Sequence, residues 1–81
     1  MVYVDNMKAP YRRMLMCHMA ADTVEELHEM ADHIGIQRKW FQNKPRFPHY
    51  DICQTKKALA IGAGAIAITQ KELVTFFRRN I

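Results

Sequence analysis

Residues 14–35 read MLMCHMAADTVEELHEMADHIG, and this stretch predicts a strand followed by a helix. Its first eight residues are an apolar run broken only by His18. A run of this length without polar alternation favours a strand that is covered on both faces. Because side chains alternate along a strand, we expect His18 to share one face with Met14 and Met16, opposite Cys17.

The helix that follows is marked at both ends. Asp22 with Glu25, or Thr23 with Glu26, has the spacing of a capping box, in which two side chains bond the first free backbone N–H groups of a helix. Gly35 can adopt the left-handed conformation that ends a helix. One apolar stripe, with His28 on or beside it, is expected to pack on the sheet: Val24, Leu27, Ala31 and Ile34.

On the N-terminal side, residues 2–5 (VYVD) are rich in β-forming side chains and predict the first strand. Residues 6–13 are expected to form a loop. On the other side, residues 36–50 (IQRKWFQNKPRFPHY) contain two prolines and no clean period, which predicts a long loop. Long loops in compact domains are usually functional or disordered, and the four aromatic side chains argue against disorder.

The remaining residues predict helix, strand and helix. Asp51 can cap a helix over residues 52–61 that ends at Gly62 and Gly64. The short apolar run AIAI, residues 65–68, predicts the third strand. A second capping box then opens the last helix, whose inner face would hold these residues: Thr69 and Glu72 for the box, and Leu73, Val74, Phe76, Phe77 and Ile81 for the face.

The sequence therefore predicts a single domain over residues 1–81 of the α/β (α+β) class. We expect a small two-layer domain with a sheet of about three strands, in the order β-β-α-loop-α-β-α. The composition agrees, since 49% hydrophobic and 25% charged residues are ordinary for a globular protein.

Size and composition also indicate where the protein is located and how it is stabilised. No apolar run approaches the roughly 20 residues of a membrane span, and the start of the chain has no signal-peptide pattern, so we expect a cytoplasmic protein without a membrane segment. A domain of 81 residues hides only roughly 60% of its unfolded surface. Two cysteines cannot form a disulfide framework, so a homo-oligomer is the expected source of added stability.

Charges are segregated along the chain, which carries a net charge of +4. Residues 22–32 hold five acids and no lysine or arginine, whereas four cations between Arg38 and Arg46 are followed by no acid until Asp51. This polarity favours an anionic ligand, or docking on the acidic face of another copy. A merely solvated surface is the alternative.

Five short motifs resemble a small family of bacterial and phage proteins known as a domain of unknown function. They are VYVD (2–5), MCHM (16–19), ELH (26–28), WFQ (40–42) and HYDI (49–52). The resemblance spans residues 2 to about 69 and implies a fold-sized unit with a polar signature, without an established activity. The family often has a second acid where this chain has Asn6, and a glycine where it has Arg12. Both departures argue against a two-carboxylate metal site at the end of the first strand.

The candidate ligand-binding residues are Asp5, Arg38, Trp40, His49, Tyr50, Asp51 and Lys56. Cations interleaved with aromatics suit stacking on bases and neutralisation of phosphates, although Trp40 could equally anchor the loop on the core. His49, Tyr50 and Asp51 would lie at a helix start, where free N–H groups favour anions, with Lys56 one turn further on. Alternatively, Asp51 is only a cap.

Asp5 ends the first strand, where α/β domains usually display functional acids, and it could otherwise be a turn residue that bonds its own loop. The opening VYVD-Asn6 is also similar to that of PIN-like and NYN nucleases, whose strand-end Asp binds a metal. Such nucleases have several further acids on a larger sheet.

A metal set is a weaker possibility, formed by His18, His28, His49 and Asp51. No pair of histidines has the H-x-x-x-H spacing, and a histidine on an apolar face is more often a satisfied core residue. Cys17 is expected to be a buried, inert thiol.

Two classes of function remain. The first is an oligomeric binding module for a small anionic, phosphorylated, nucleotide-like ligand, such as a phage-type protein that sequesters or senses a signal molecule. The alternative is a small hydrolase or nuclease that depends on a divalent metal, or a nucleic-acid-binding domain without catalysis. The sequence leaves open whether the protein is an enzyme, and it predicts no other cofactor.

Overall fold

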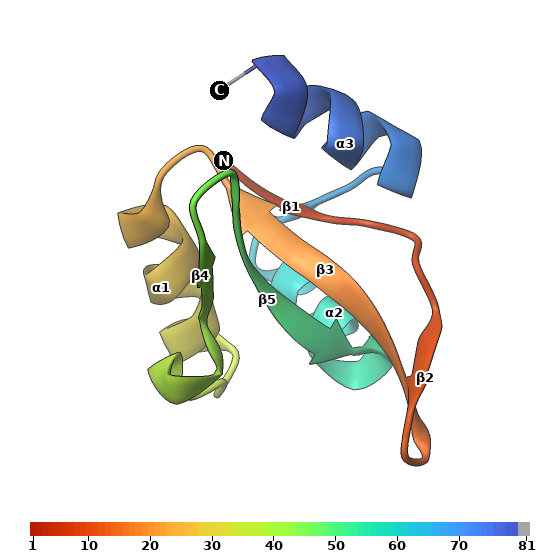
Figure 1. Cartoon of the computed structure of the whole chain (residues 1–81). Helices are drawn as coiled ribbons and strands as arrows, with labels where there is room; N and C mark the ends of the chain where they lie inside the picture. The colour runs from red at the N-terminus through yellow and green to blue at the C-terminus, as the bar shows by residue number, and fades with distance from the viewer. Residues whose placement is uncertain (80–81) are drawn as a thin grey trace.

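A computed structural model describes residues 1–79 as a six-stranded sheet with three α-helices (Figure 1). The strands are β1 (Val2–Val4), β2 (Ala9–Tyr11), β3 (Met14–Ala21), β4 (Gln42–Lys44), β5 (Phe47–Cys53) and β6 (Ile66–Ala67). The helices are α1 (Val24–His33), the short 3-10 helix η1 (Arg38–Trp40), α2 (Gln54–Gly62) and α3 (Gln70–Arg79).

The sheet has the order β4-β5-β3-β1-β6 and is antiparallel except between β1 and β6. β3 is the long central strand, with β5 along one edge and β1 followed by β2 along the other. Between β1 and β2 the chain leaves the ladder, and Asp5 lies in this gap beside β3, where its backbone N–H bonds the carbonyl of His18. The gap brings an acidic side chain against the middle of the sheet.

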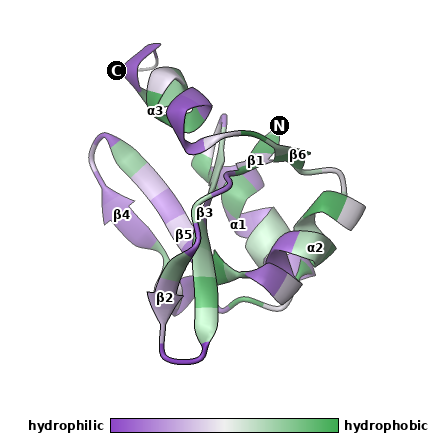
Figure 2. Cartoon of the chain, turned by 90° about the vertical axis from the view of Figure 1, so that its right-hand side faces the viewer, coloured by the Kyte–Doolittle hydropathy of each residue, from purple (hydrophilic) through white to green (hydrophobic). Residues whose placement is uncertain are grey.

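The two faces of the sheet are covered differently. On one face, Val4, Met19, Tyr50 and Ile52 pack with residues of α1 and α2 in the hydrophobic core, where Leu27 is 1% exposed. Figure 2 shows α1 and α2 together on this side and α3 on the other. α3 contacts the second face through two ring pairs, Phe76 with Tyr3 and Phe77 with Phe47. The second face is otherwise open toward the β2–β3 hairpin.

The predicted fold class is correct, but the predicted order and the count of about three strands are wrong. Residues 6–13 contain β2, and residues 36–50 contain η1, β4 and the first part of β5. Proline is rare inside strands, so these two segments were predicted to be loops. In the structure, Pro10 pairs with Leu15 in the β2–β3 hairpin, and Pro48 pairs with Asn43 in the β4–β5 hairpin. Proline is tolerated in edge strands, where its missing N–H removes no central ladder bond.

The predicted helix over residues 52–61 is present as α2, but it begins at Gln54 and its predicted cap, Asp51, is wrong. Asp51 lies inside β5, and α2 begins at Gln54 after Cys53, whose side chain makes no capping bond. Gly64 does adopt a left-handed conformation after α2, with φ of 107°. Because Asp51 lies in a strand and caps no helix, its carboxylate can contribute to a site on the face of the sheet.

The other helix-end signals agree with the structure, but Val24 and Val74, which were expected on the inner faces, are 37% and 47% exposed. Thr23 accepts a bond from the Glu26 N–H at the start of α1, and Gly35 has φ of 82° after its end. Thr69 and Glu72 form the reciprocal bonds of a capping box on α3. Along β3 the expected coverage on both faces fails at the outer end, where Leu15 is 43% exposed. Ile81, expected on the inner face of α3, lies outside the described residues.

Arg12, in the turn between β2 and β3, has φ of 56°, a left-handed conformation that favours glycine. No helix within residues 1–79 has the length and apolar character needed to cross a bilayer.

Candidate functional site

Three polar side chains meet on the open face of the sheet, and the strand register explains why. His18 in β3 pairs directly with Asp51 in β5, so both side chains lie on one face. His49 precedes Asp51 by two residues and therefore points to the same side. We call His18, His49 and Asp51 the triad.

The ligating atoms of the triad converge. His18 Nε2 lies 3.9 Å from Asp51 Oδ1, and His49 Nε2 lies 3.5 Å from the same oxygen. All three atoms are within 4.8 Å of one another. Two ligands held about 2.1 Å from one tetrahedral ion lie roughly 3.4 Å apart. His49 and Asp51, at 3.5 Å, already have this spacing, and His18 would have to move closer to share an ion with them.

The outer nitrogen of each histidine is already bonded. His18 Nδ1 lies 2.7 Å from Asp5 Oδ2, and His49 Nδ1 lies 2.7 Å from the carbonyl oxygen of Phe47. Both acceptors are oxygens without a proton, so each Nδ1 carries the hydrogen and each Nε2 presents its lone pair to the triad. Metal-bound histidines are typically oriented in this way.

Asp5 holds His18 in place through hydrogen bonds to its backbone and its ring. Its side chain is fully buried, and its Oδ1 accepts the backbone N–H groups of His18 at 2.9 Å and Met7 at 3.3 Å. Its Oδ2 accepts the ring N–H of His18. Asp5, which the sequence suggested as a ligand-binding residue, thus contacts His18 and lies away from solvent.

Burial shapes the chemistry of His49, whose side chain is 4% exposed. Burial lowers the pKa of His49 below its ordinary value of 6.5, against the opposing effects of the Phe47 carbonyl and the Asp51 charge. The ring of Phe47 stacks on the His49 ring at 4.1 Å and meets the His18 ring edge-on at 5.1 Å. Neutral imidazole is the form that binds metals, and this environment favours it.

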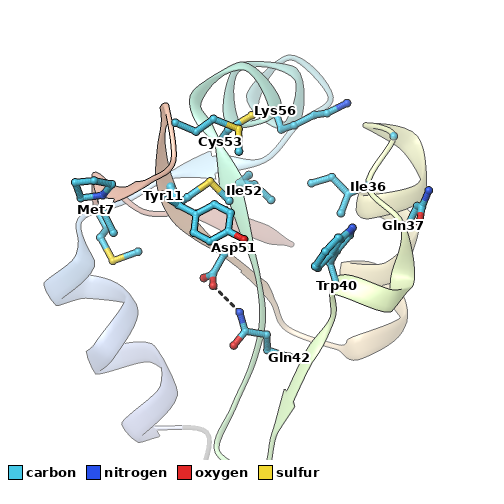
Figure 3. A pocket seen from close by; sticks show the side chains of 15 residues that line it. Met7, Tyr11, Ile36, Gln37, Trp40, Gln42, Asp51, Ile52, Cys53 and Lys56 are labelled. Atoms are coloured by element: carbon cyan, nitrogen blue, oxygen red, sulfur yellow. Dashed lines mark hydrogen bonds between the residues drawn. The ribbon is translucent and has the colours of Figure 1, made fainter.

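Asp51 has two separate partners. Its Oδ1 faces the histidines, while its Oδ2 accepts a hydrogen bond from the Gln42 side-chain amide, as Figure 3 shows. The side chain is 37% exposed, so solvent or a ligand can reach it. Asp51 is therefore the open side of the triad.

A cavity of about 670 Å³ adjoins the triad at Asp51. Its walls come from the β2–β3 hairpin, from residues 35–40 and from the end of β5 (Figure 3). Trp40 is 60% exposed and lines it, together with Tyr11 from the opposite wall. Lys56 also lines the cavity, but its Nζ donates to the Ile34 carbonyl at 2.8 Å.

The other predicted site residues lie elsewhere. Arg38 points away and forms a two-pronged ion pair with Asp32, at 3.2 and 2.8 Å. Tyr50 is fully buried on the opposite face of the sheet, where its hydroxyl lies 2.7 Å from His28 Nδ1. His28 is therefore separate from the triad. Burial raises the pKa of Cys17 to about 11, so this thiol stays protonated.

Sequence reasoning missed the contributions of Gln42, Phe47 and Tyr11. It assigned all three to loops, where no face can be defined. Alternation in residues 47–53 (FPHYDIC) carries the missing signal, because a strand there puts Phe47, His49 and Asp51 on one face.

Comparison with known proteins agrees with the family resemblance. The chain matches the family described as "Protein of unknown function (DUF4031)" over residues 2–80. Neither a curated protein nor a solved structure is significantly similar to it. With nearly its full length matched, the chain belongs to the DUF4031 family.

Proposed function

We propose that this protein binds a divalent metal ion through His18, His49 and Asp51 and uses it to bind and hydrolyse a small phosphorylated ligand. One observation carries the proposal: three ligating atoms converge within 4.8 Å while both histidines are held by their outer nitrogens. Histidines that bind a metal typically donate their other ring N–H in this way, which supports the proposal.

The alternative is a hydrogen-bonded cluster that only stabilises the fold. In such a cluster we would expect N–H···O distances of about 2.7–3.2 Å. The two Nε2–Oδ1 distances are 3.5 and 3.9 Å, and neither Nε2 has a hydrogen bond within residues 1–79. The ligating atoms of the triad are thus too far apart for hydrogen bonds to one another. A metal ion bound between them would accept a lone pair from each.

The ligand types indicate the chemistry. Two imidazoles and one carboxylate suit zinc, manganese or iron(II), and three protein ligands leave positions for water and substrate. A divalent ion held by His18, His49 and Asp51 would supply an acidified water and polarise a phosphoryl oxygen. Hydrolysis would add one water across the ester P–O bond, with its OH on phosphorus and its hydrogen on the leaving oxygen.

Metal binding and turnover can be tested together. The EDTA-treated protein should bind Zn²⁺ or Mn²⁺ at one ion per chain by calorimetry, and metal addition should restore hydrolysis of bis(p-nitrophenyl) phosphate. His49→Gln should lower metal affinity at least tenfold. His33→Gln, an exposed histidine on α1, is the matched control and should bind metal normally. Equal metal affinity of both variants, or no metal binding at all, would refute the proposal.

A metal-dependent binding module without turnover is the second candidate. It is favoured by the scarcity of acids, since Asp5 is fully buried and Asp51 is committed to the triad. Metal binding with no hydrolysis would select this candidate. Steeply salt-dependent binding of long nucleic acid would instead select a nucleic-acid-binding role.

The proposal also covers the oligomeric state of the protein and its location in the cell. We infer a homo-oligomer, because Leu59, Ile61 and Val74 are large apolar side chains that are 43–50% exposed. We infer a cytoplasmic location, in keeping with two unpaired cysteines, Cys17 and Cys53.

A further inference from the structure

We infer that the cavity beside the triad binds the base of a nucleotide whose phosphate lies at the Asp51 end. This deepens the proposed function, on which the phosphate position rests. The base position depends on the cavity alone. Asp51 connects the two because it belongs to the triad and also lines the cavity (Figure 3).

The walls of the cavity suit a flat ring. Tyr11 and Trp40 face each other across it from β2 and η1, and they are 53% and 60% exposed. Large exposed aromatic side chains that line one cavity point to a ligand, and bases of any sequence stack on such rings. The volume of about 670 Å³ is within the usual range of small-molecule sites.

The other residues that line the cavity favour an uncharged group with hydrogen-bonding edges. Met14, Met16 and Ile36 supply apolar surface, and the amides of Gln37 and Gln42 can bond the edge of a base. The only ionised side chains in the lining are Lys56, which is bonded to the Ile34 carbonyl, and Asp51. An anionic group is therefore poorly placed in the cavity and better placed at the metal beside Asp51.

A cationic side chain lies beside each of the two aromatic rings, Tyr11 and Trp40. The Arg12 guanidinium lies 5.7 Å from the centre of the Tyr11 ring, and the Lys39 ammonium lies 5.2 Å from that of Trp40. Both are exposed and would attract a negatively charged nucleotide to this side of the molecule as it approaches. Arg38 is neutralised by Asp32 and does not extend them into a basic track, which favours a single nucleotide over a strand of nucleic acid.

Trp40 is the only tryptophan in the sequence, so its fluorescence reports on the cavity directly. The zinc-loaded protein should be titrated with AMP, GMP, CMP and UMP, and with adenosine and ribose 5-phosphate as the two halves. We expect at least one nucleotide to quench Trp40 and to bind at least tenfold more tightly than either half. Tyr11→Ala should weaken this binding at least fivefold. Leu15→Ala, an exposed residue of the same hairpin outside the cavity, should leave it unchanged.

The outcomes separate this inference from the proposed function. Quenching that persists in a protein unable to bind metal would support the base site while the metal proposal fails. Zinc binding without any nucleotide binding, by fluorescence and by equilibrium dialysis, would overturn the inference and leave the metal centre standing. Tighter binding of a ten-residue oligothymidine than of any mononucleotide, or equal effects of Tyr11→Ala and Leu15→Ala, would also overturn it.

Discussion

Asp5 holds the His18 ring at Nδ1, the nitrogen that faces away from the proposed metal site. Asp5→Asn keeps an oxygen for the backbone N–H groups of His18 and Met7 but puts an N–H₂ group against His18 Nδ1. The ring would then accept at Nδ1 and carry its hydrogen on Nε2, where the metal should bind. We expect zinc affinity to fall about 10–100-fold, measured by calorimetry.

The same substitution at an exposed site provides the control. Asp32→Asn breaks only the exterior ion pair with Arg38 and should not change zinc affinity. Nitrogen NMR of the imidazoles reports the His18 tautomer directly, and dispersed backbone amide signals show separately that the variant is still folded. An unchanged tautomer with unchanged affinity in Asp5→Asn contradicts the role assigned to Asp5.

Single positions were the most predictable part of the site. His18, His49, Asp51 and Asp5 could all be singled out from residue type and position, and they lie together. Their roles could not be assigned, because Asp5 reaches His18 only through the break between β1 and β2. That contact depends on strand register, which no local pattern specifies.

Both ends of α1 and the start of α3 were predictable because their caps are local, whereas the cap predicted for α2, Asp51, was wrong. Thr23, Gly35 and the Thr69–Glu72 pair act within a few residues of one another, so their spacing is visible in the sequence. β2 and β4 span three residues each and exist only as partners of β3 and β5. Short strands of this kind gain their stability from pairing, so their sequences resemble loops.

The start of α3 gives a test of this local reasoning. The Thr69 hydroxyl accepts the Glu72 N–H at 3.1 Å, and Glu72 accepts the Thr69 N–H at 2.9 Å. Thr69→Ala should lower the free energy of unfolding by about 1 kcal/mol in urea titrations. It should also speed amide exchange across Gln70–Arg79.

Thr75→Ala is the matched control for this change. Thr75 is exposed in the middle of α3 and bonds only the Lys71 carbonyl, and alanine is the better helix former. This variant should be neutral or slightly more stable. Equal losses in Thr69→Ala and Thr75→Ala would show that the capping box adds nothing to the stability of α3.

Across the fold, the proposed metal ion would join strands that are far apart in the sequence. His18 lies on β3, His49 and Asp51 lie on β5, and Asp5 links His18 to the end of β1. A ligand that binds only the folded state stabilises it by about 2.7 kcal/mol at 100 times its Kd. In a domain of this size each kcal/mol raises Tm by about 4–8 °C.

We therefore expect saturating Zn²⁺ to raise the Tm of the EDTA-treated protein by roughly 10–20 °C in a calorimetric scan. His33→Gln should retain the shift, whereas His49→Gln should lose most of it because the remaining two ligands bind zinc weakly. Scans at several protein concentrations separate this effect from assembly, since only an oligomer gains stability with concentration. A Tm that is the same with and without Zn²⁺, in a protein that binds one ion per chain, would mean that the unfolded chain binds the ion equally well, which contradicts a site that only folding brings together between β3 and β5.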